Sequence, residues 1–513
     1  MLWHFIYITQ AIEFALLPLN MYRTYLTVLI LLYSLTARGQ QYVYDYDDNC
    51  RKAYNAYIGL QMPEGDAAIY AEIRQHPYNL MATYIADYGD FLSLLFSGDK
   101  NSYVQRKDHL EERIDILERG SHDSPWYHFC KAGLYLHWAL VRIRFNDNLG
   151  AALVFRKSYL QSDENRKKHP DFTYNQLFYG LEQTVTGTIP ENYKWIAVLF
   201  GLKGDVKKGI ANLTEFVNTH TDEDPLKAEG VIYYLYLRFY LLSQRAEVWD
   251  YINSSKLNTH NNLLYAFLKA NVALNYRKAD AAVQAMTEAQ SNKYYSRYPI
   301  FDYETGCALL NKLDPACIGY FERFLKNYTG KPYVKDAWQK MALYYYAKNN
   351  GTQGNYCRDK IPDAGNTATD ADKQAQRFAE NKIVPNTYIL QARLLIDGGY
   401  YNRALEILLK MNDKGLPIQD QLEYDFRLAR AYDELGNHEK ALQLYQATIN
   451  LGSERQEHFA ARAALQMGFL YEKEGKRNEA IQHFKEALSM RDHDFQTSID
   501  QQAKAGINRL GEK

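Results

Sequence analysis

The chain has 513 residues, enough for several domains, and its 60 lysines and arginines nearly balance its 61 aspartates and glutamates. Because no excess of positive charge supplies a basic stripe, the composition argues against a nucleic-acid-binding protein. The 45 tyrosines and 22 phenylalanines are typical of helices packed through aromatic side chains. An aromatic-lined groove for a peptide or glycan is the alternative interpretation.

The five cysteines form no CxxC pair, so we do not expect a zinc site. They are Cys50, Cys130, Cys307, Cys317 and Cys357. We expect buried free thiols, as is usual for unpaired cysteines. A disulfide between Cys307 and Cys317 is the alternative in an oxidising compartment.

Two apolar segments precede residue 40. The first, residues 1–20, contains Glu13 and Pro18 and makes a poor membrane span. A lipid-anchored start is not expected, because Cys50 lies ten residues beyond Gln40.

The second apolar segment is typical of a secretory signal peptide. It begins at Met21 with the basic Arg23, continues through the run YLTVLILLYSL, and ends with the small residues Ala37 and Gly39. We therefore expect residues 1–39 to be a signal peptide, with Met21 as the true start and cleavage after Gly39. An uncleaved membrane anchor is the alternative.

Residues 40–220 are expected to form a divergent N-terminal helical domain. Apolar residues recur there three and four positions apart, for example Tyr84, Tyr88, Phe91 and Leu95. His128 and His137 are nine residues apart on one predicted helix. Since two ligands on one helical face need a spacing of three or four, we do not expect a metal site there.

Within this domain, residues 180–213 place Pro190 at a predicted helix start and Gly201 and Gly204 in a turn between helices. The turn lacks the Gly-Lys-Ser/Thr ending of a phosphate loop. The order of glycines, proline and apolar stretches is similar to a segment of the tetratricopeptide repeat protein 39 family. The resemblance implies a divergent arm of a helical solenoid rather than an enzyme domain, and it leaves a carrier of an apolar ligand open as an alternative function.

Residues 221–348 continue as degenerate helix-pair repeats, with capped and helically spaced stretches at 280–289 and 314–328. Residues 349–384 interrupt this rhythm, because they are rich in Gly, Asn, Asp and Thr and contain few large apolar side chains before Phe378. We expect a flexible insertion there, either a loosely packed loop or a lid over a groove.

The clearest pattern lies in residues 428–490, where one unit occurs twice. The matching positions are Ala429 and Gly468, Tyr432 and Tyr471, Gly436 and Gly475, Ala441 and Ala480, and Tyr445 and Phe484. An earlier copy places Ala392, Gly399 and Ala404 at the same spacing. This order of small, aromatic and glycine residues resembles the tetratricopeptide repeat (TPR). Small residues let two antiparallel helices approach closely, and a glycine ends the first helix of each pair.

The resemblance implies an all-α fold, a right-handed α-solenoid of antiparallel helix pairs. We expect TPR repeats over residues 385–492 and a C-terminal capping helix over residues 493–513, whose polar surface suits the end of a stack.

No HExxH motif, GxSxG motif or nucleotide loop is present, so we expect neither an enzyme nor a cofactor. In the TPR family the first helix of each pair faces a concave groove and carries the ligand contacts. The corresponding positions in this chain are Ile389, Arg393, Phe426, Arg430, Glu434, Leu465, Phe469 and Lys473. Apolar residues beside charges of both signs suit an amphipathic or extended peptide. The Asn and Lys pattern with which some family members grip a C-terminal carboxylate is absent.

These features together predict an exported, non-catalytic scaffold that holds a protein or peptide partner in the periplasm or on the envelope of a bacterium with an outer membrane. An envelope glycan-binding protein is the alternative. Exposed tryptophans would favour that alternative and buried ones would weaken it; the residues in question are Trp126, Trp138, Trp195, Trp249 and Trp338.

Overall fold

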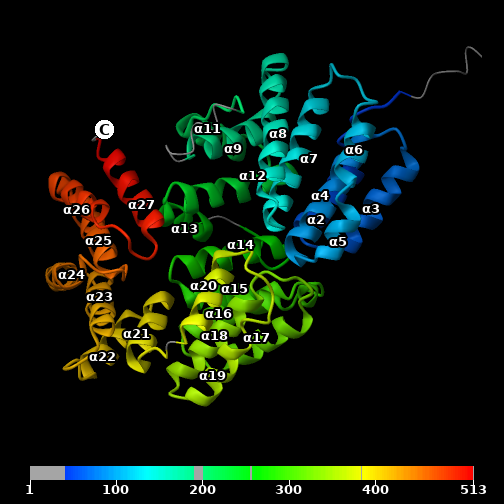
Figure 1. The fold of residues 1–513 in the computed structure, drawn as a ribbon. Helices are drawn as coiled ribbons and strands as arrows, with labels where there is room; N and C mark the ends of the chain where they lie inside the picture. Colours follow the sequence, from blue (N-terminus) through cyan, green and yellow to red (C-terminus); the bar gives the residue numbers. More distant parts are fainter. Residues whose placement is uncertain (1–40, 190–199, 255–256, 383, 512–513) are drawn as a thin grey trace, which may run out of the picture.

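The computed structural model of the protein describes residues 41–189, 200–254, 257–382 and 384–511. Within these residues the regular structure is helical, apart from an isolated bridge between Val43 and Asn79. The helices follow one another along an arc from the N-terminal to the C-terminal part of the chain (Figure 1). The prediction of an all-α solenoid is confirmed.

Two of the predictions concern residues outside this description. The expected signal peptide, residues 1–39, lies outside it, and so do residues 190–199, in the middle of the segment that is similar to the tetratricopeptide repeat protein 39 family. Among the residues that are described, no helix is long and apolar enough to cross a membrane.

Several helices of the N-terminal part begin at capping side chains. The helices of this part are α2 (Asp48–Ile58), α3 (Met62–Gln75), α4 (Leu80–Ser97), α5 (Lys100–Arg106), α6 (His109–Leu117), α7 (Pro125–Arg144), α8 (Asn148–Lys168) and α9 (Asn175–Gly187). The side chain of Ser124 accepts a hydrogen bond from the Trp126 amide, and Pro125 occupies the first turn of α7. A serine cap followed by proline is a strong helix start, because proline has no amide that would be left without a partner.

The remaining helices form successive antiparallel pairs. They are α11 (Val206–Thr219), α12 (Pro225–Tyr236) with the π-helical continuation η2 (Leu237–Leu241), α13 (Arg245–Ser254), α14 (Leu263–Asn275), α15 (Ala279–Ala289), the 3-10 turn η3 (Tyr295–Arg297), α16 (Ile300–Asn311), α17 (Ala316–Asn327), α18 (Val334–Ala347), α19 (Gly351–Asp359), α20 (Asp370–Asn381), α21 (Thr387–Gly398), α22 (Tyr401–Lys410), α23 (Ile418–Glu434), α24 (His438–Gly452), α25 (Phe459–Lys473), α26 (Arg477–Ser489) and α27 (Gln496–Arg509). The first helices α14, α16, α18, α21, α23 and α25 contact one another in turn, and α25 contacts α27, the predicted capping helix. These contacts define what we call the first-helix face of the solenoid.

The buried apolar residues divide the chain differently from the expected domain boundaries. One continuous core cluster runs from Tyr46 to Leu394, across the expected boundary between residues 220 and 221. The C-terminal pairs have smaller clusters of their own, one around α21 to α23 and one around α23 to α27. The N-terminal helices therefore share one core with the central pairs, and the C-terminal repeats extend from it.

Residues 349–384 do not form the irregular insertion that we expected. They fold into α19 and α20, both of which pack on α18. The side chains of Asn350 and Thr369 cap these helices. Ile361 and Ala375 are fully buried, and the Lys335 ammonium donates to the Ile361 carbonyl oxygen at 2.7 Å. The sequence was misleading because small alanines and polar contacts, rather than large apolar side chains, hold this pair in place.

Aromatic rings press against residues that have little or no side chain where helices approach closely. The fully buried Phe484 ring of α26 lies between Gly468 of α25 and Gly506 of α27, and a Cβ built on either glycine would come within 2.5 Å of the ring. Tyr57 of α2 fills the same kind of gap between Gly65 of α3 and Gly89 of α4. Glycine at these positions permits an approach that any side chain would prevent.

We therefore expect Gly468→Ala to lower the unfolding free energy of the C-terminal repeats by about 1–3 kcal/mol, because the added methyl group overpacks the trapped Phe484 ring. Gly319→Ala is the matched control: Gly319 is also helical, and its Cβ would meet nothing nearer than Arg323 at 3.9 Å. That change should raise stability by up to about 1 kcal/mol through helix propensity. Urea unfolding together with amide hydrogen exchange of α25 to α27 measures both, and equal effects of the two substitutions would contradict the packing argument.

Candidate functional site

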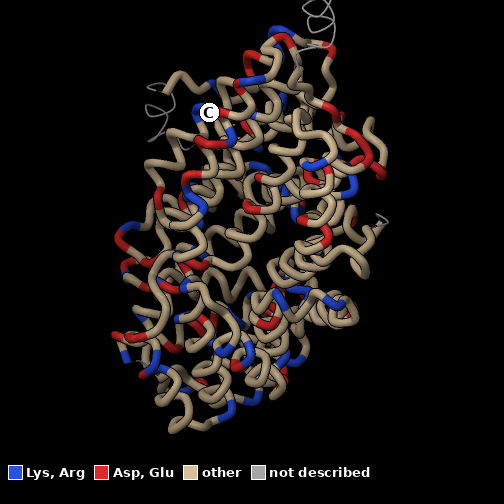
Figure 2. Tube along the Cα trace, turned by 90° about the vertical axis from the view of Figure 1, so that its right-hand side faces the viewer, with Lys and Arg blue, Asp and Glu red and all other residues tan. Residues whose placement is uncertain are grey.

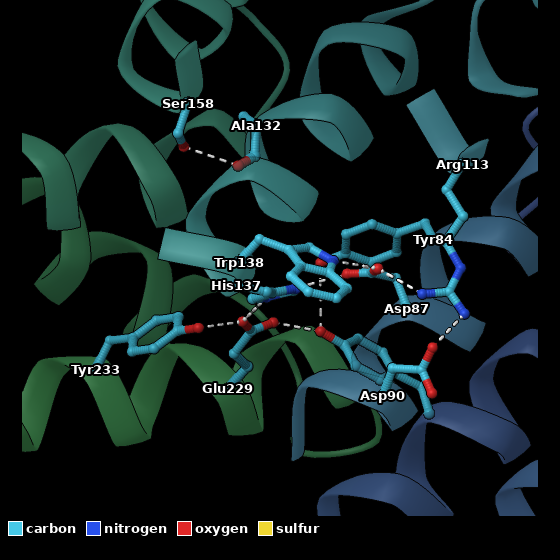
Figure 3. Close-up of polar contacts among 11 residues, drawn as sticks. Tyr84, Asp87, Asp90, Arg113, Ala132, His137, Trp138, Ser158, Glu229 and Tyr233 are labelled. Atoms are coloured by element: carbon cyan, nitrogen blue, oxygen red, sulfur yellow. Dashed lines mark hydrogen bonds and ion pairs between the residues drawn. The ribbon is translucent and has the colours of Figure 1, made fainter. Parts of the chain in front are cut away.

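The densest group of buried charges lies where α4, α6, α7 and α12 meet (Figure 3). Asp87 of α4 accepts hydrogen bonds from Arg113 of α6 at 2.7 Å and from the Trp138 indole at 2.9 Å. His137 of α7 donates from Nε2 to Oε1 of Glu229 on α12 at 3.0 Å, and its Nδ1 lies 3.7 Å from Oδ2 of Asp87. One imidazole therefore sits between two carboxylates from helices far apart in the sequence.

The electrostatics of this cluster favour a protonated histidine. Burial by itself would lower the pKa of His137, but Asp87 and Glu229 outweigh it and raise the pKa to about 9. Glu229 also accepts hydrogen bonds from the hydroxyl groups of Tyr54 and Tyr233. Asp87 and His137 are fully buried and Glu229 is 1% exposed, so no substrate can reach these groups. The cluster ties α4 and α7 to α12 and is a structural element.

A second group, Asp47, Cys50 and Glu72, has potential metal ligand atoms within 4.8 Å of one another. The Glu72 carboxylate already accepts hydrogen bonds from Asn49, Asn79 and the His76 imidazole. The Asn79 amide also points at the Cys50 sulfur, at 3.6 Å, and burial raises the pKa of the Cys50 thiol. These contacts account for the group as the anchor between α2 and α3 and leave no ligand atom without a partner.

All five cysteines are free and buried. The prediction of buried free thiols is confirmed, and the alternative of a bond between Cys307 and Cys317 is not realised.

A row of charged side chains crosses the first-helix face of the C-terminal pairs. We call this set the charged row; its members are Arg393 and Asp397 on α21, Glu423, Arg427, Arg430, Asp433 and Glu434 on α23, Arg462 and Gln466 on α25, and Arg277 from the turn after α14. Glu423 lies 3.6 Å from Arg393 and 3.1 Å from Arg427. Arg430 donates to Gln466 at 2.8 Å, and Arg277 pairs with Glu434 at 2.6 Å. The row therefore adds ion pairs and hydrogen bonds to the apolar contacts between α21, α23 and α25. Along the chain, lysines and arginines are interspersed with aspartates and glutamates (Figure 2).

Residues 423–451 match the model of the tetratricopeptide repeat family. The match covers most of α23 and α24, the middle of the three C-terminal pairs. The chain therefore contains a tetratricopeptide repeat at residues 423–451. Among solved structures it is similar to the crystal structure of the APC/C hetero-tetramer Cut9-Hcn1, with 12% sequence identity, 90% of this chain and 95% of that chain covered, and a TM-score of 0.22. The comparison with curated proteins gives no match.

The eight residues that the TPR resemblance implied as groove contacts fall into two groups in the structure. Ile389, Phe426 and Leu465 are 2%, 3% and 1% exposed, so the prediction that their side chains line a groove is wrong. The others lie on or beside the charged row: Arg393 and Phe469 are half-buried, Arg430 is buried, and Glu434 and Lys473 are exposed. The Phe469 ring packs against Phe484, and Arg509 of α27 reaches over it, so the capping helix partly covers this position.

The error concerns single positions on two helices, since Arg393, Arg430 and Glu434 are both predicted positions and members of the row. On α23 the row uses Glu423 and Arg427 where we expected Phe426, and on α25 it uses Arg462 and Gln466 where we expected Leu465. Adjacent positions on a helix differ by about 100°, so a face assigned from family positions turns into the core when the helix is rotated slightly. The spacing of charged residues along α23 was the signal in the sequence that could have corrected it.

Two clefts lie away from the charged row. The larger, of 660 Å³, opens between the ends of α24 and α26 and is lined mainly by polar side chains, among them Arg455, Glu486 and Arg491. The smaller, of 320 Å³, lies beside Tyr174 and Asp224. Neither brings together a nucleophile, a base and an oxyanion donor, so neither has the arrangement of an active site.

The His137 cluster makes stability depend on pH. Its folded pKa of about 9 lies above the unfolded value of about 6.5, so its contribution is complete below pH 6.5 and is lost as the pH rises through 9. The difference in unfolding free energy between the wild type and His137→Gln should shrink by about 3 kcal/mol between pH 6 and pH 9.5. Trp138→Phe, which removes an uncharged donor to Asp87, is the control and should show a constant difference. Urea titrations at both pH values measure this, and a constant difference for His137→Gln would show that the imidazole is neutral.

Proposed function

We propose that this TPR protein is an exported, non-catalytic scaffold that binds a protein or peptide partner along the charged row of its first-helix face. The observation that carries the proposal is the row itself, which spans three helix pairs and is fixed in place by ion pairs between neighbouring helices. TPR repeats generally mediate contacts between proteins.

The row has the properties of a recognition surface rather than of a solvated helix face. Its arginine side chains are mostly buried: Arg427 is 14% and Arg430 7% exposed, and Arg393 is 27% exposed. Side chains held in this way lose little conformational entropy when a partner binds, and arginine is enriched at the centres of interfaces. Partial burial also strengthens charge interactions relative to those on an open surface.

The proposal of export rests on the basic start, apolar run and small residues between Met21 and Gly39. On this proposal the mature protein acts in the periplasm or on the envelope. Retention of the uncleaved segment as a membrane anchor is the alternative.

The other two functions receive less support. Of the tryptophans named above, Trp138 is buried and Trp126, Trp249 and Trp338 are half-buried, while Trp195 lies outside the described residues. None of these four offers the exposed platform on which sugar rings stack, which weakens the glycan-binding alternative. For an apolar-ligand carrier, the two clefts described above give no support, because polar side chains dominate their walls.

Export has a direct test in the N-terminal sequence of the protein isolated from its native cells. We expect the mature chain to begin at Gln40, because cleavage should follow Gly39. A chain that keeps residue 21 at its start and sediments with membranes would support the anchor instead. Substituting Ala37 by Arg should block processing, and Arg38→Lys is the control that leaves the small residues in place.

Partner binding on the first-helix face is testable by site-specific photo-crosslinking in intact cells. A photoreactive residue at Arg393 or Lys473 of the first helices should give one defined adduct, identified by mass spectrometry. The same residue at Glu406 of α22 or Glu479 of α26, both exposed on second helices, should give none. The adduct should disappear when Arg427→Glu reverses a charge of the row. Equal adducts at the second-helix positions, or no adduct at any position, would overturn the proposal.

A further inference from the structure

Two charged side chains in the charged row, Arg462 and Asp397, make no ion pair with another described residue, and only Arg462 also keeps a side-chain atom buried without a partner. Arg462 is half-buried on α25, its guanidinium makes no hydrogen bond or ion pair with another described residue, and its Nε is buried without a hydrogen-bond partner. The neighbouring arginines have acidic partners: Glu423 pairs with Arg393 and Arg427, and Asp433 and Glu434 pair with Arg430. Burying even part of a cation without a counter-charge or a hydrogen bond is unfavourable, so the unpaired Nε calls for a reason.

The charges around Arg462 do not balance. Within the described residues of the row, five guanidinium groups face four carboxylates: Arg277, Arg393, Arg427, Arg430 and Arg462 against Asp397, Glu423, Asp433 and Glu434. Burial, and after it the positive charges of Arg427, Arg277 and Arg430, lower the pKa of Arg462 to about 10. Asp397 acts on it in the opposite direction but lies outside ion-pair distance. The row as a whole therefore carries a surplus of one positive charge, and Arg462 is its one arginine without an ion pair among the described residues.

Two histidines lie near Arg462: the Arg462 amide donates to the His458 carbonyl oxygen at 2.9 Å, and the His458 ring contacts Phe495, two residues after His493. Burial and the nearby Arg462 and Arg427 lower the pKa of His458 to about 3, so its imidazole is neutral at physiological pH. His493, from the turn before α27, also acts on His458, is 8% exposed, and keeps its Nε2 buried without a partner. A neutral imidazole can donate a hydrogen bond to an anion without adding charge.

From this arrangement we infer that Arg462, together with Arg427 and the two imidazoles of His458 and His493, forms a binding site for one carboxylate group of the partner, an acidic side chain or the carboxyl terminus of a peptide. The inference rests on the proposed function, because the carboxylate belongs to a peptide lying on the first-helix face. The site lies in a different place from the Asn and Lys pattern that grips C-terminal carboxylates in some TPR proteins, and it uses different side chains.

The chemistry favours a carboxylate over other anions. A guanidinium offers a planar fork of donors that matches the two oxygens of a carboxylate. The surplus of a single positive charge is neutralised by a monoanion, whereas a phosphate group would bring close to two negative charges at neutral pH. Binding would pair the free Nε of Arg462 and relieve the repulsion among the neighbouring arginines.

The test uses the full chain and peptides selected on it from a random phage-displayed library with free carboxyl termini. The selected peptides should share an acidic residue or depend on the terminal carboxylate, and Arg462→Gln should weaken their binding about 10- to 100-fold in isothermal titration. Arg323→Gln is the matched control, because Arg323 lies on the second helix α17 and pairs with Asp302; it should leave affinity unchanged. Resynthesis of the best peptide with its acidic group replaced by an amide should remove the difference between wild type and Arg462→Gln.

The outcomes separate this inference from the proposed function. Peptides that bind wild type and Arg462→Gln equally would overturn the carboxylate site and leave the scaffold standing. A phosphoserine peptide that binds more tightly than its glutamate counterpart would overturn the assignment of the anion. A library that yields no binder counts against the site, and the crosslinking experiment then decides on the scaffold.

The melting temperature gives a second measurement, which distinguishes a binding arginine from one that stabilises the fold. Because Arg462 is repelled by its neighbours and has no partner, Arg462→Gln should keep or raise the melting temperature while it weakens binding. Arg430→Gln, which removes a side chain with several partners, should lower the melting temperature. A loss of stability in Arg462→Gln comparable to that in Arg430→Gln would overturn the assignment of Arg462 as a binding residue.

Discussion

The close approach of helices across an aromatic ring is the constraint on which the rest of this structure depends. Phe484 between Gly468 and Gly506, and Tyr57 between Gly65 and Gly89, show the same solution in repeats that otherwise share little sequence. A large ring on one helix supplies the buried area, and a residue without a side chain on its neighbour supplies the room. This explains why a chain so rich in tyrosine and phenylalanine builds a layered stack of helices.

Charge plays two different parts in the two halves of the molecule. In the N-terminal half, the buried His137 cluster joins helices from distant parts of the sequence, and nearly every group in it has a partner. In the C-terminal half, the charged row runs over the first-helix face, and Arg462 and Asp397 in it make no ion pair with another described residue. The first arrangement holds distant helices together, and in our proposal the second binds a partner.

The C-terminal repeats could be predicted from the sequence because the signals that end their helices lie within the repeat itself. Gly399, Gly436 and Gly475 end first helices with positive φ angles of 89°, 80° and 75°, a conformation that glycine adopts without strain. The helix pair at residues 349–384 could not be predicted in this way, because it is held by distant partners such as the Lys335 ammonium on the Ile361 carbonyl oxygen. The shared N-terminal core depends likewise on contacts such as Arg144 with Tyr328, 184 residues apart. The predicted site positions lie on the first helices, but which of their side chains are buried, Phe426 among them, depends on packing between helices.

The division of the core gives the molecule a stiff base and a compliant arm. One large apolar cluster extends from Tyr46 to Leu394, whereas the C-terminal pairs are held by separate small clusters. In a stack of this kind, opening or bending at one junction leaves the rest intact. A load applied at α27 is therefore absorbed within the last three helix pairs, and the curvature of that arm can adjust to the length of whatever it holds while the base stays rigid.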